Sequence, residues 1–305
     1  MNHFTFDMQR PDEWSRSNAE KTISEHLQVS VSSAFHPYNT SFDDLVPDLL
    51  LLSLDQVFFY VHRHRILAAS ENSFAMLLAS PSEFSTNRSL PTVVVPEPSE
   101  ILNIIIHTIY RMSVLQYHPC FETVSATIDA LPRYGLPPKG YVCAGQPLYD
   151  LVAACAPLRP IDTYALAAAH DLAEAAAVAS AHLLSFPLST LSDELALRMG
   201  AVYLKRLFFL HYGRTDALKR ALLQPPSTHR ECPGCSLIEQ HRLTRAWTLA
   251  AAHITWDAGP NLSTHILQAT LLPLQKDLSC SKCQLALRDR VARLVVEWAL
   301  VKRTI

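Results

Sequence analysis

The stretch DLLLLSLDQVFFYVHRHRILAASENSF, at residues 48–74, contains the strongest structural pattern in the chain. It holds two apolar runs, Leu49–Leu52 and Val57–Val61, separated by a polar break in which Asp55 favours a tight turn. Two such runs joined by a few turn residues predict a β-hairpin. The run that follows, Ile66–Ala69, shows no alternation and predicts the entry to a buried helix.

These residues resemble the start of a BTB/POZ domain, in the variant that is abundant in mushroom-forming fungi. The similarity lies in Asp-Leu-x-Leu, then Phe-x-Val-His-Arg, then Leu-Ala-Ala-Ser and a Phe, and it continues more weakly to about Arg133. The resemblance implies that Asp48 faces a basic residue near a dimer interface. Because Phe74 lies one residue beyond the usual spacing, that basic partner is Arg63 or Arg65.

The sequence predicts an α+β fold in which an N-terminal BTB/POZ domain precedes an all-α region. We expect a loose tail at residues 1–40, the BTB/POZ domain at 41–135 and the helical region at 136–305. The boundary is placed where turn-forming Gly and Pro residues gather, from Gly135 to Gly145. After that point the apolar spacing is helical throughout.

Three helices of the second region have predicted buried stripes. One begins after Ser192 and ends at Gly213, and two longer ones cover about 237–256 and 283–301. The predicted stripe residues are, in chain order, Leu197, Ala201, Leu204, Phe208 and His211; Leu243, Trp247, Ala251 and Ile254; and Leu287, Val291, Leu294 and Trp298.

Composition restricts the class of protein. With 305 residues and 49 % apolar content, the chain has enough apolar residues for about two folded domains. A net charge of −2 gives no electrostatic basis for binding nucleic acid or an anionic membrane, and no apolar run reaches the roughly 18 residues of a membrane span. The polar N-terminus does not resemble a signal peptide, and an odd number of cysteines, seven, favours a reducing compartment. We therefore expect an intracellular protein, cytoplasmic or nuclear.

The strongest chemical pattern is a pair of C-x-x-C units, Cys232 with Cys235 and Cys280 with Cys283. A two-residue gap lets both sulfurs of one unit reach a single tetrahedral zinc ion. Each unit precedes a predicted helix, whose positive N-terminal end favours the thiolate form that zinc binds. The four cysteines are therefore predicted to hold one structural zinc, with His229 as an alternate ligand. Unconnected thiols and a redox-active dithiol are the other interpretations.

Searches for catalytic motifs find no nucleotide-binding glycine pattern, no G-x-S-x-G and no H-E-x-x-H, so no catalytic residue is predicted. BTB domains are interaction modules, commonly homodimers, and some are substrate adaptors of cullin-3 ubiquitin ligases. The resemblance therefore implies a non-enzymatic adaptor with protein partners, and cullin-3 is a candidate among them. Residues 81–83 are faintly similar to the hydrophobic-x-Glu feature used for cullin contact. The alternative is a zinc-dependent or thiol-redox enzyme that uses the C-x-x-C units.

Overall fold

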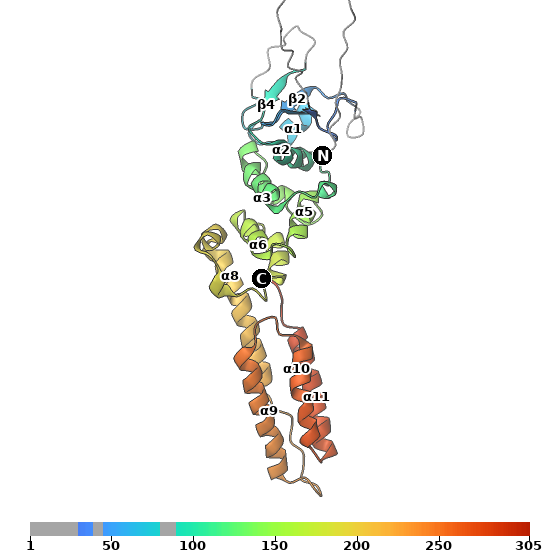
Figure 1. Cartoon of the computed structure of the whole chain (residues 1–305), viewed down its shortest axis with the longest axis vertical. Helices are drawn as coiled ribbons and strands as arrows, with labels where there is room; N and C mark the ends of the chain where they lie inside the picture. Colours follow the sequence, from blue (N-terminus) through green and yellow to red (C-terminus); the bar gives the residue numbers. More distant parts are fainter. Residues whose placement is uncertain (1–29, 39–44, 80–89) are drawn as a thin grey trace, which may run out of the picture. The chain divides into compact units, whose positions relative to one another are not determined.

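The computed structural model describes residues 30–38, 45–79 and 90–305. The chain divides into two compact units, residues 1–154 and 155–305. The described residues form an α+β fold with one four-stranded sheet and eleven α-helices, which agrees with the predicted fold class (Figure 1). The sheet lies in the first unit, and the second unit is helical. Most of the predicted tail, and residues 81–83, lie outside the described residues.

The sheet is built on the predicted hairpin of β2 (Leu49–Leu52) and β3 (Val57–Val61), which pair antiparallel with Leu49 opposite Val61. Two short strands flank it in parallel, β1 (Ser30–Val31) beside β3 and β4 (Thr92–Val94) beside β2, which gives the order β1-β3-β2-β4. Leu49, Leu51, Phe59 and Val61 are buried. β1 falls inside the predicted tail, so the folded part of the chain begins earlier than the sequence pattern indicated.

The His-Arg pair, His62 and Arg63, lies where β3 passes into α1 (Arg63–Ala69), and His62 holds this junction in place. The His62 ring is buried, and its Nε2 donates to the backbone oxygen of Leu45 at 2.8 Å. The Tyr110 hydroxyl accepts from the His62 backbone N–H and lies 2.8 Å from Nδ1. These bonds connect the end of β3 to Tyr110, the residue that follows the helix at residues 99–109.

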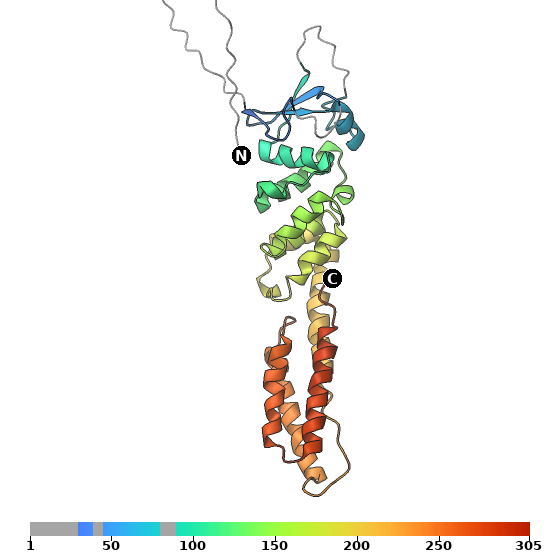
Figure 2. The same cartoon turned by 90° about the vertical axis from the view of Figure 1, so that its right-hand side faces the viewer.

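Six helical segments complete the first unit: α2 (Ser99–Ile109), η1 (Leu115–Tyr117), α3 (Phe121–Ala130), η2 (Leu131–Tyr134), α4 (Pro138–Tyr141) and α5 (Pro147–Cys155). In Figures 1 and 2, α2 lies under the sheet and α3 packs on α2. The predicted domain boundary at residue 135 falls inside this unit. Gly135 has φ +68°, and a Cβ there would lie 2.5 Å from the Asn72 amide oxygen, so this turn packs directly on the residues after α1.

The second unit contains α6 (Pro160–Ala169), α7 (Ala173–Ala181), η3 (Leu188–Thr190), α8 (Asp193–Leu222), α9 (Leu237–Asp257), α10 (Thr264–Leu271), η4 (Leu272–Asp277) and α11 (Ser281–Ala299). α6 and α7 pack on one another, α8 packs on α9 and α11, and α10 packs on α9 and α11 (Figure 2). Neither α10 nor η4 was predicted from the sequence pattern.

Helices α9 and α11 match their predicted extents within two residues. All eight of their predicted stripe residues are buried, so both stripes are confirmed. The tryptophan side chains of these two helices also donate hydrogen bonds to backbone carbonyl groups at a helix end and in a loop. The Trp247 indole N–H donates to the Leu222 oxygen at 2.9 Å, and the Trp298 indole N–H to the Leu262 oxygen at 2.7 Å. These buried donors fix the ends of neighbouring segments as well as fill the core.

Helix α8 differs from its prediction in length and in orientation. It continues through Gly213 to Leu222, and the one non-helical residue inside it is Gly200, with φ 70° and ψ 164°. Of the predicted stripe only His211 is buried in full, whereas Leu197 and Phe208 are exposed. The buried residues are Met199, Tyr203, Leu207, Leu210, His211, Arg214, Leu218 and Leu222. These buried positions repeat every three or four residues from Met199 to Leu222, so the buried side of α8 is offset from the predicted stripe along its whole length.

Candidate metal centre

The first C-x-x-C unit forms a tight turn just before α9. The backbone N–H of Cys235 donates to the Cys232 oxygen at 2.9 Å, and Gly234 adopts φ +83° after Pro233. Pro followed by Gly in this conformation is the signature of a type II turn. The turn places the Cys235 thiol inside the bundle, where the residue is 2 % exposed.

The second unit begins α11, with Cys280 as the residue that precedes the helix and Cys283 in its first turn. The backbone N–H groups of Cys283 and Lys282 donate to the Cys280 sulfur and lower the pKa of that thiol to about 6. This is the expected effect of amides at a helix N-terminus on a thiolate. Cys283 points into the core and is 4 % exposed.

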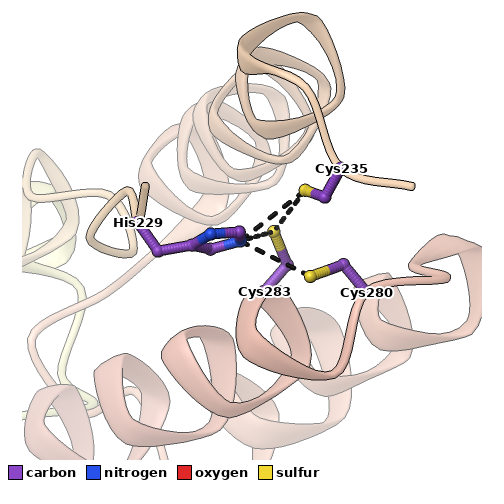
Figure 3. A group of neighbouring side chains, drawn as sticks. All are labelled: His229, Cys235, Cys280 and Cys283. Atoms are coloured by element: carbon purple, nitrogen blue, oxygen red, sulfur yellow. Dashed lines mark hydrogen bonds between the residues drawn. The ribbon is translucent and has the colours of Figure 1, made fainter. Parts of the chain in front are cut away.

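His229 joins the two units from the segment between α8 and α9. Its Nδ1 lies 2.7 Å from the Arg230 backbone oxygen, which can only accept, so Nδ1 carries the proton. The unprotonated Nε2 therefore faces the sulfurs (Figure 3). The His229 backbone N–H donates to the Gln240 side-chain oxygen at 2.9 Å, which anchors this segment to α9. A ring held in this tautomer by its other nitrogen is typical of a metal-ligating histidine.

Four donor atoms converge on one point. His229 Nε2 lies 3.2 Å from Cys283 Sγ, 3.6 Å from Cys235 Sγ and 3.5 Å from Cys280 Sγ. The Cys235 and Cys283 sulfurs are 3.6 Å apart although they are separated by 48 positions in the sequence. All four atoms lie within 4.8 Å of one another, and this group could hold a metal ion (Figure 3).

Cys232 is the one predicted metal ligand that is not a member of this group. It is partly buried, and its thiol hydrogen-bonds with the Cys280 and Cys235 sulfurs, so it lies beside the cluster. His229, three residues earlier, takes the fourth position that the sequence prediction gave to Cys232. The pattern His-x-x-Cys-x-x-Cys brings three donors into one short segment, and its spacing alone does not decide which two of them join the cluster.

The thiols differ in how readily they lose a proton. Burial raises the pKa of Cys235 to about 12, and burial is also the largest influence that raises the pKa of Cys232 and of Cys283. Without a metal, the cluster therefore keeps most of its protons and places its negative charge on Cys280. A bound cation would displace those protons, which couples metal binding to proton release.

The cluster is continuous with the hydrophobic core of the second unit. Cys235 and Cys283 belong to the same buried group as Trp247, Leu287 and Leu294, and Cys232 and Cys280 pack against its edge. A metal bound here would link the start of α9 to the start of α11 across that core.

Asp48 and its two predicted basic partners, Arg63 and Arg65, make contacts within the first unit. The Asp48 carboxylate accepts a hydrogen bond from the Arg63 backbone N–H at 2.7 Å, at the first residue of α1. The Arg63 side chain donates to the Leu78 backbone oxygen at 2.8 Å, and the Arg65 guanidinium lies 5.2 Å from the centre of the Tyr110 ring. Asp48 therefore stabilises the N-terminus of α1.

In comparisons with known proteins, no family model, curated protein or solved structure matches the chain. The BTB/POZ assignment therefore stays a prediction from the residues quoted above. None of the helices that the structure describes combines the length and the apolar character needed to cross a lipid bilayer.

Proposed function

We propose that this chain is a non-enzymatic protein-binding protein, with a BTB/POZ-type first unit and a second unit built around a structural zinc ion. The observation that carries the zinc assignment is the set of donor distances. With Zn–S near 2.3 Å and Zn–N near 2.0–2.1 Å, neighbouring ligands of a tetrahedral zinc lie about 3.5–3.8 Å apart. Of the four donor separations given above, three fall between 3.5 and 3.6 Å and the other is 3.2 Å, and every pair of donors lies within 4.8 Å.

Ligand chemistry also favours zinc. Thiolate and imidazole donors in tetrahedral arrangement select zinc over magnesium or calcium, which prefer oxygen. Three cysteines and one histidine fill the coordination shell with protein atoms and leave no position for a substrate. A closed shell is typical of structural zinc and argues against the alternative of a zinc-dependent enzyme. A thiol-redox enzyme would instead cycle two of these sulfurs through a disulfide.

Metal analysis of the purified chain, together with mass spectrometry under non-reducing conditions, separates these alternatives. We expect one zinc per chain and free thiols after removal of the metal by a chelator. A chain that contains no zinc and a reversible disulfide within the cluster would support the redox enzyme instead. Affinity purification of partners, with cullin-3 assayed directly, distinguishes a ubiquitin-ligase adaptor from another kind of interaction protein.

The interaction function of the first unit rests on the BTB/POZ resemblance and is supported by the hairpin, the buried His62 and the capping contact of Asp48. We expect a homodimer at micromolar concentration, measured by light scattering. Asp48→Ala should increase the monomer fraction, because it removes the carboxylate that orders the start of α1. Asp289→Ala, an exposed change in the second unit, is the matched control. A strictly monomeric wild-type chain would count against the family assignment.

Gln240 is expected to position His229 for zinc. Gln240→Ala removes the acceptor of the His229 backbone N–H, so the segment that carries the imidazole loses its anchor. Losing such a supporting contact typically costs about 10–100-fold in metal affinity. Competition with a chromophoric chelator measures this change. Gln268→Ala, an exposed glutamine on α10, should leave the affinity unchanged, and equal affinities for both variants would contradict the assigned role.

A further inference from the structure

Helix α8 carries an exposed apolar face that the core does not use. Val202, Phe209 and Tyr212 are 61 %, 62 % and 69 % exposed. Their spacing of seven and then three residues places them on one side of the helix. This face begins two residues after Gly200, the one residue inside α8 with non-helical dihedral angles.

A cavity of about 590 Å³ lies next to this face, between α7, α8 and the segment 301–305. Phe209, Leu210 and Ile305 provide its apolar lining, and Arg206 and Lys302 provide charged groups. Phe209 belongs to both the exposed face and the cavity, so the two form one continuous surface. We call it the α8 groove. Its apolar lining is suited to an inserted apolar side chain.

Basic side chains outnumber acidic ones around the α8 groove, and α7 adds Glu174 next to the lining residue Ala173. Within residues 195–215 and 300–305 the charged side chains are Arg198, Lys205, Arg206, Arg214, Lys302 and Arg303, with no carboxylate side chain. Arg214 is buried and engaged, since it donates to the backbone oxygens of Pro260, Val301 and Lys302. The nearby carboxylate of Asp171 accepts from the Tyr203 hydroxyl at 2.8 Å. Arg206 and Lys302 are exposed at the rim, where the Arg206 guanidinium lies 4.7 Å from the centre of the Tyr203 ring and the Lys302 ammonium donates to the Ile305 oxygen at 2.7 Å.

We propose that the α8 groove binds an acidic peptide segment of a partner protein, with one apolar side chain inserted between Phe209 and Ile305. Carboxylates of the segment would pair with Arg206 and Lys302, because a guanidinium and an ammonium at the rim of an apolar pocket select for negative charge beside an apolar anchor. This inference deepens the proposed protein-binding function by assigning it a surface in the second unit, and it does not depend on the BTB/POZ assignment.

The test uses the full chain and a fluorescein-labelled twelve-residue peptide made of Glu, Asp, Leu and Phe. Fluorescence anisotropy should show saturable binding that weakens as sodium chloride is raised, since exposed ion pairs are screened by salt. Arg206→Glu combined with Lys302→Glu should weaken binding at least tenfold. Phe209→Ala, which changes the apolar contact alone, should also weaken it. Lys219→Glu, an exposed charge reversal on the same helix outside the groove, should not.

Circular dichroism confirms that each variant is folded before binding is compared. Equal peptide affinity for the groove variants and for Lys219→Glu would overturn the proposal. Binding of phosphatidylserine vesicles without binding of the peptide would assign the groove to a membrane surface and also overturn it. If the peptide fails to bind while affinity purification still recovers partners through the first unit, the groove assignment is wrong and the proposed function stands.

Discussion

Replacement of Cys283 by serine is expected to abolish zinc binding and to destabilise the helical bundle of the second unit. Cys283 is buried and lies close to two other donors of the cluster, with His229 Nε2 at 3.2 Å and Cys235 Sγ at 3.6 Å. A serine hydroxyl is a poor zinc ligand at neutral pH because it stays protonated. The variant should therefore purify with far less than one zinc per chain, as measured by elemental analysis.

The expected size of the destabilisation follows from chain entropy. A link between Cys235 and Cys283 closes a segment of 48 positions. Closing a loop of that size costs about 4 kcal/mol on the disulfide scale. Structural zinc in small domains contributes about 10–16 kcal/mol of apparent binding free energy, so the ion can offset this cost with several kcal/mol remaining. At about 2–4 °C per kcal/mol, removal of the metal should lower the melting temperature of the second unit by roughly 10 °C or more.

Cys232 provides the matched control for this prediction. Cys232→Ser removes a thiol that lies beside the four-donor group, so the variant should keep one zinc per chain and most of its thermal stability. His229→Ala should instead lower the affinity. The reverse result, with loss of zinc from Cys232→Ser and none from His229→Ala, would restore the four-cysteine site predicted from the sequence. X-ray absorption at the zinc edge distinguishes the two sites, because the site with His229 has three sulfur neighbours and the four-cysteine site has four.

Sequence patterns predicted those parts of the site whose signals are local. The two-residue gaps in the C-x-x-C units, and the stripes of α9 and α11, are set by neighbours within one or two helical turns. Whether Cys232 or His229 is the fourth ligand depends on the hydrogen bonds of His229 to Arg230 and Gln240. Gln240 belongs to α9, whereas His229 lies in the segment before that helix. No spacing rule contains that tertiary contact.

The early predicted end of α8 and the early domain boundary have similar causes. A glycine can lie in a helix or interrupt it, and only packing decided that Gly200, not Gly213, would leave helical geometry. Likewise, Gly135 was predicted as part of a linker between domains. Its positive φ instead allows the chain to pack on Asn72, which keeps the following helices with the first unit. Turn-forming residues predict a change of direction, and they do not predict what the turn packs against.

The second large effect is expected at Arg290 of α11, which is 3 % exposed. Its Nε donates to the Gln224 backbone oxygen at 2.9 Å, and a guanidinium NH₂ group donates to the backbone oxygen of Ala221. These carbonyls end α8, where helix geometry leaves acceptors without partners. Glu297, at 3.3 Å, balances the charge from a half-exposed position. Arg290 of α11 therefore caps the C-terminal end of α8.

Arg290→Met keeps much of the side-chain volume and removes every donor. A buried carbonyl left without a partner costs about 1–3 kcal/mol; Ala221 is half-buried and Gln224 is exposed, so the variant should lose about 1–3 kcal/mol of unfolding free energy. Thermal denaturation measures the loss, and Arg293→Met, an exposed arginine on the same helix, should change the melting temperature little. Because the segment that carries His229 begins where α8 ends, Arg290→Met should also weaken zinc binding. Equal melting temperatures for the two variants would show that the α8 terminus does not depend on this arginine.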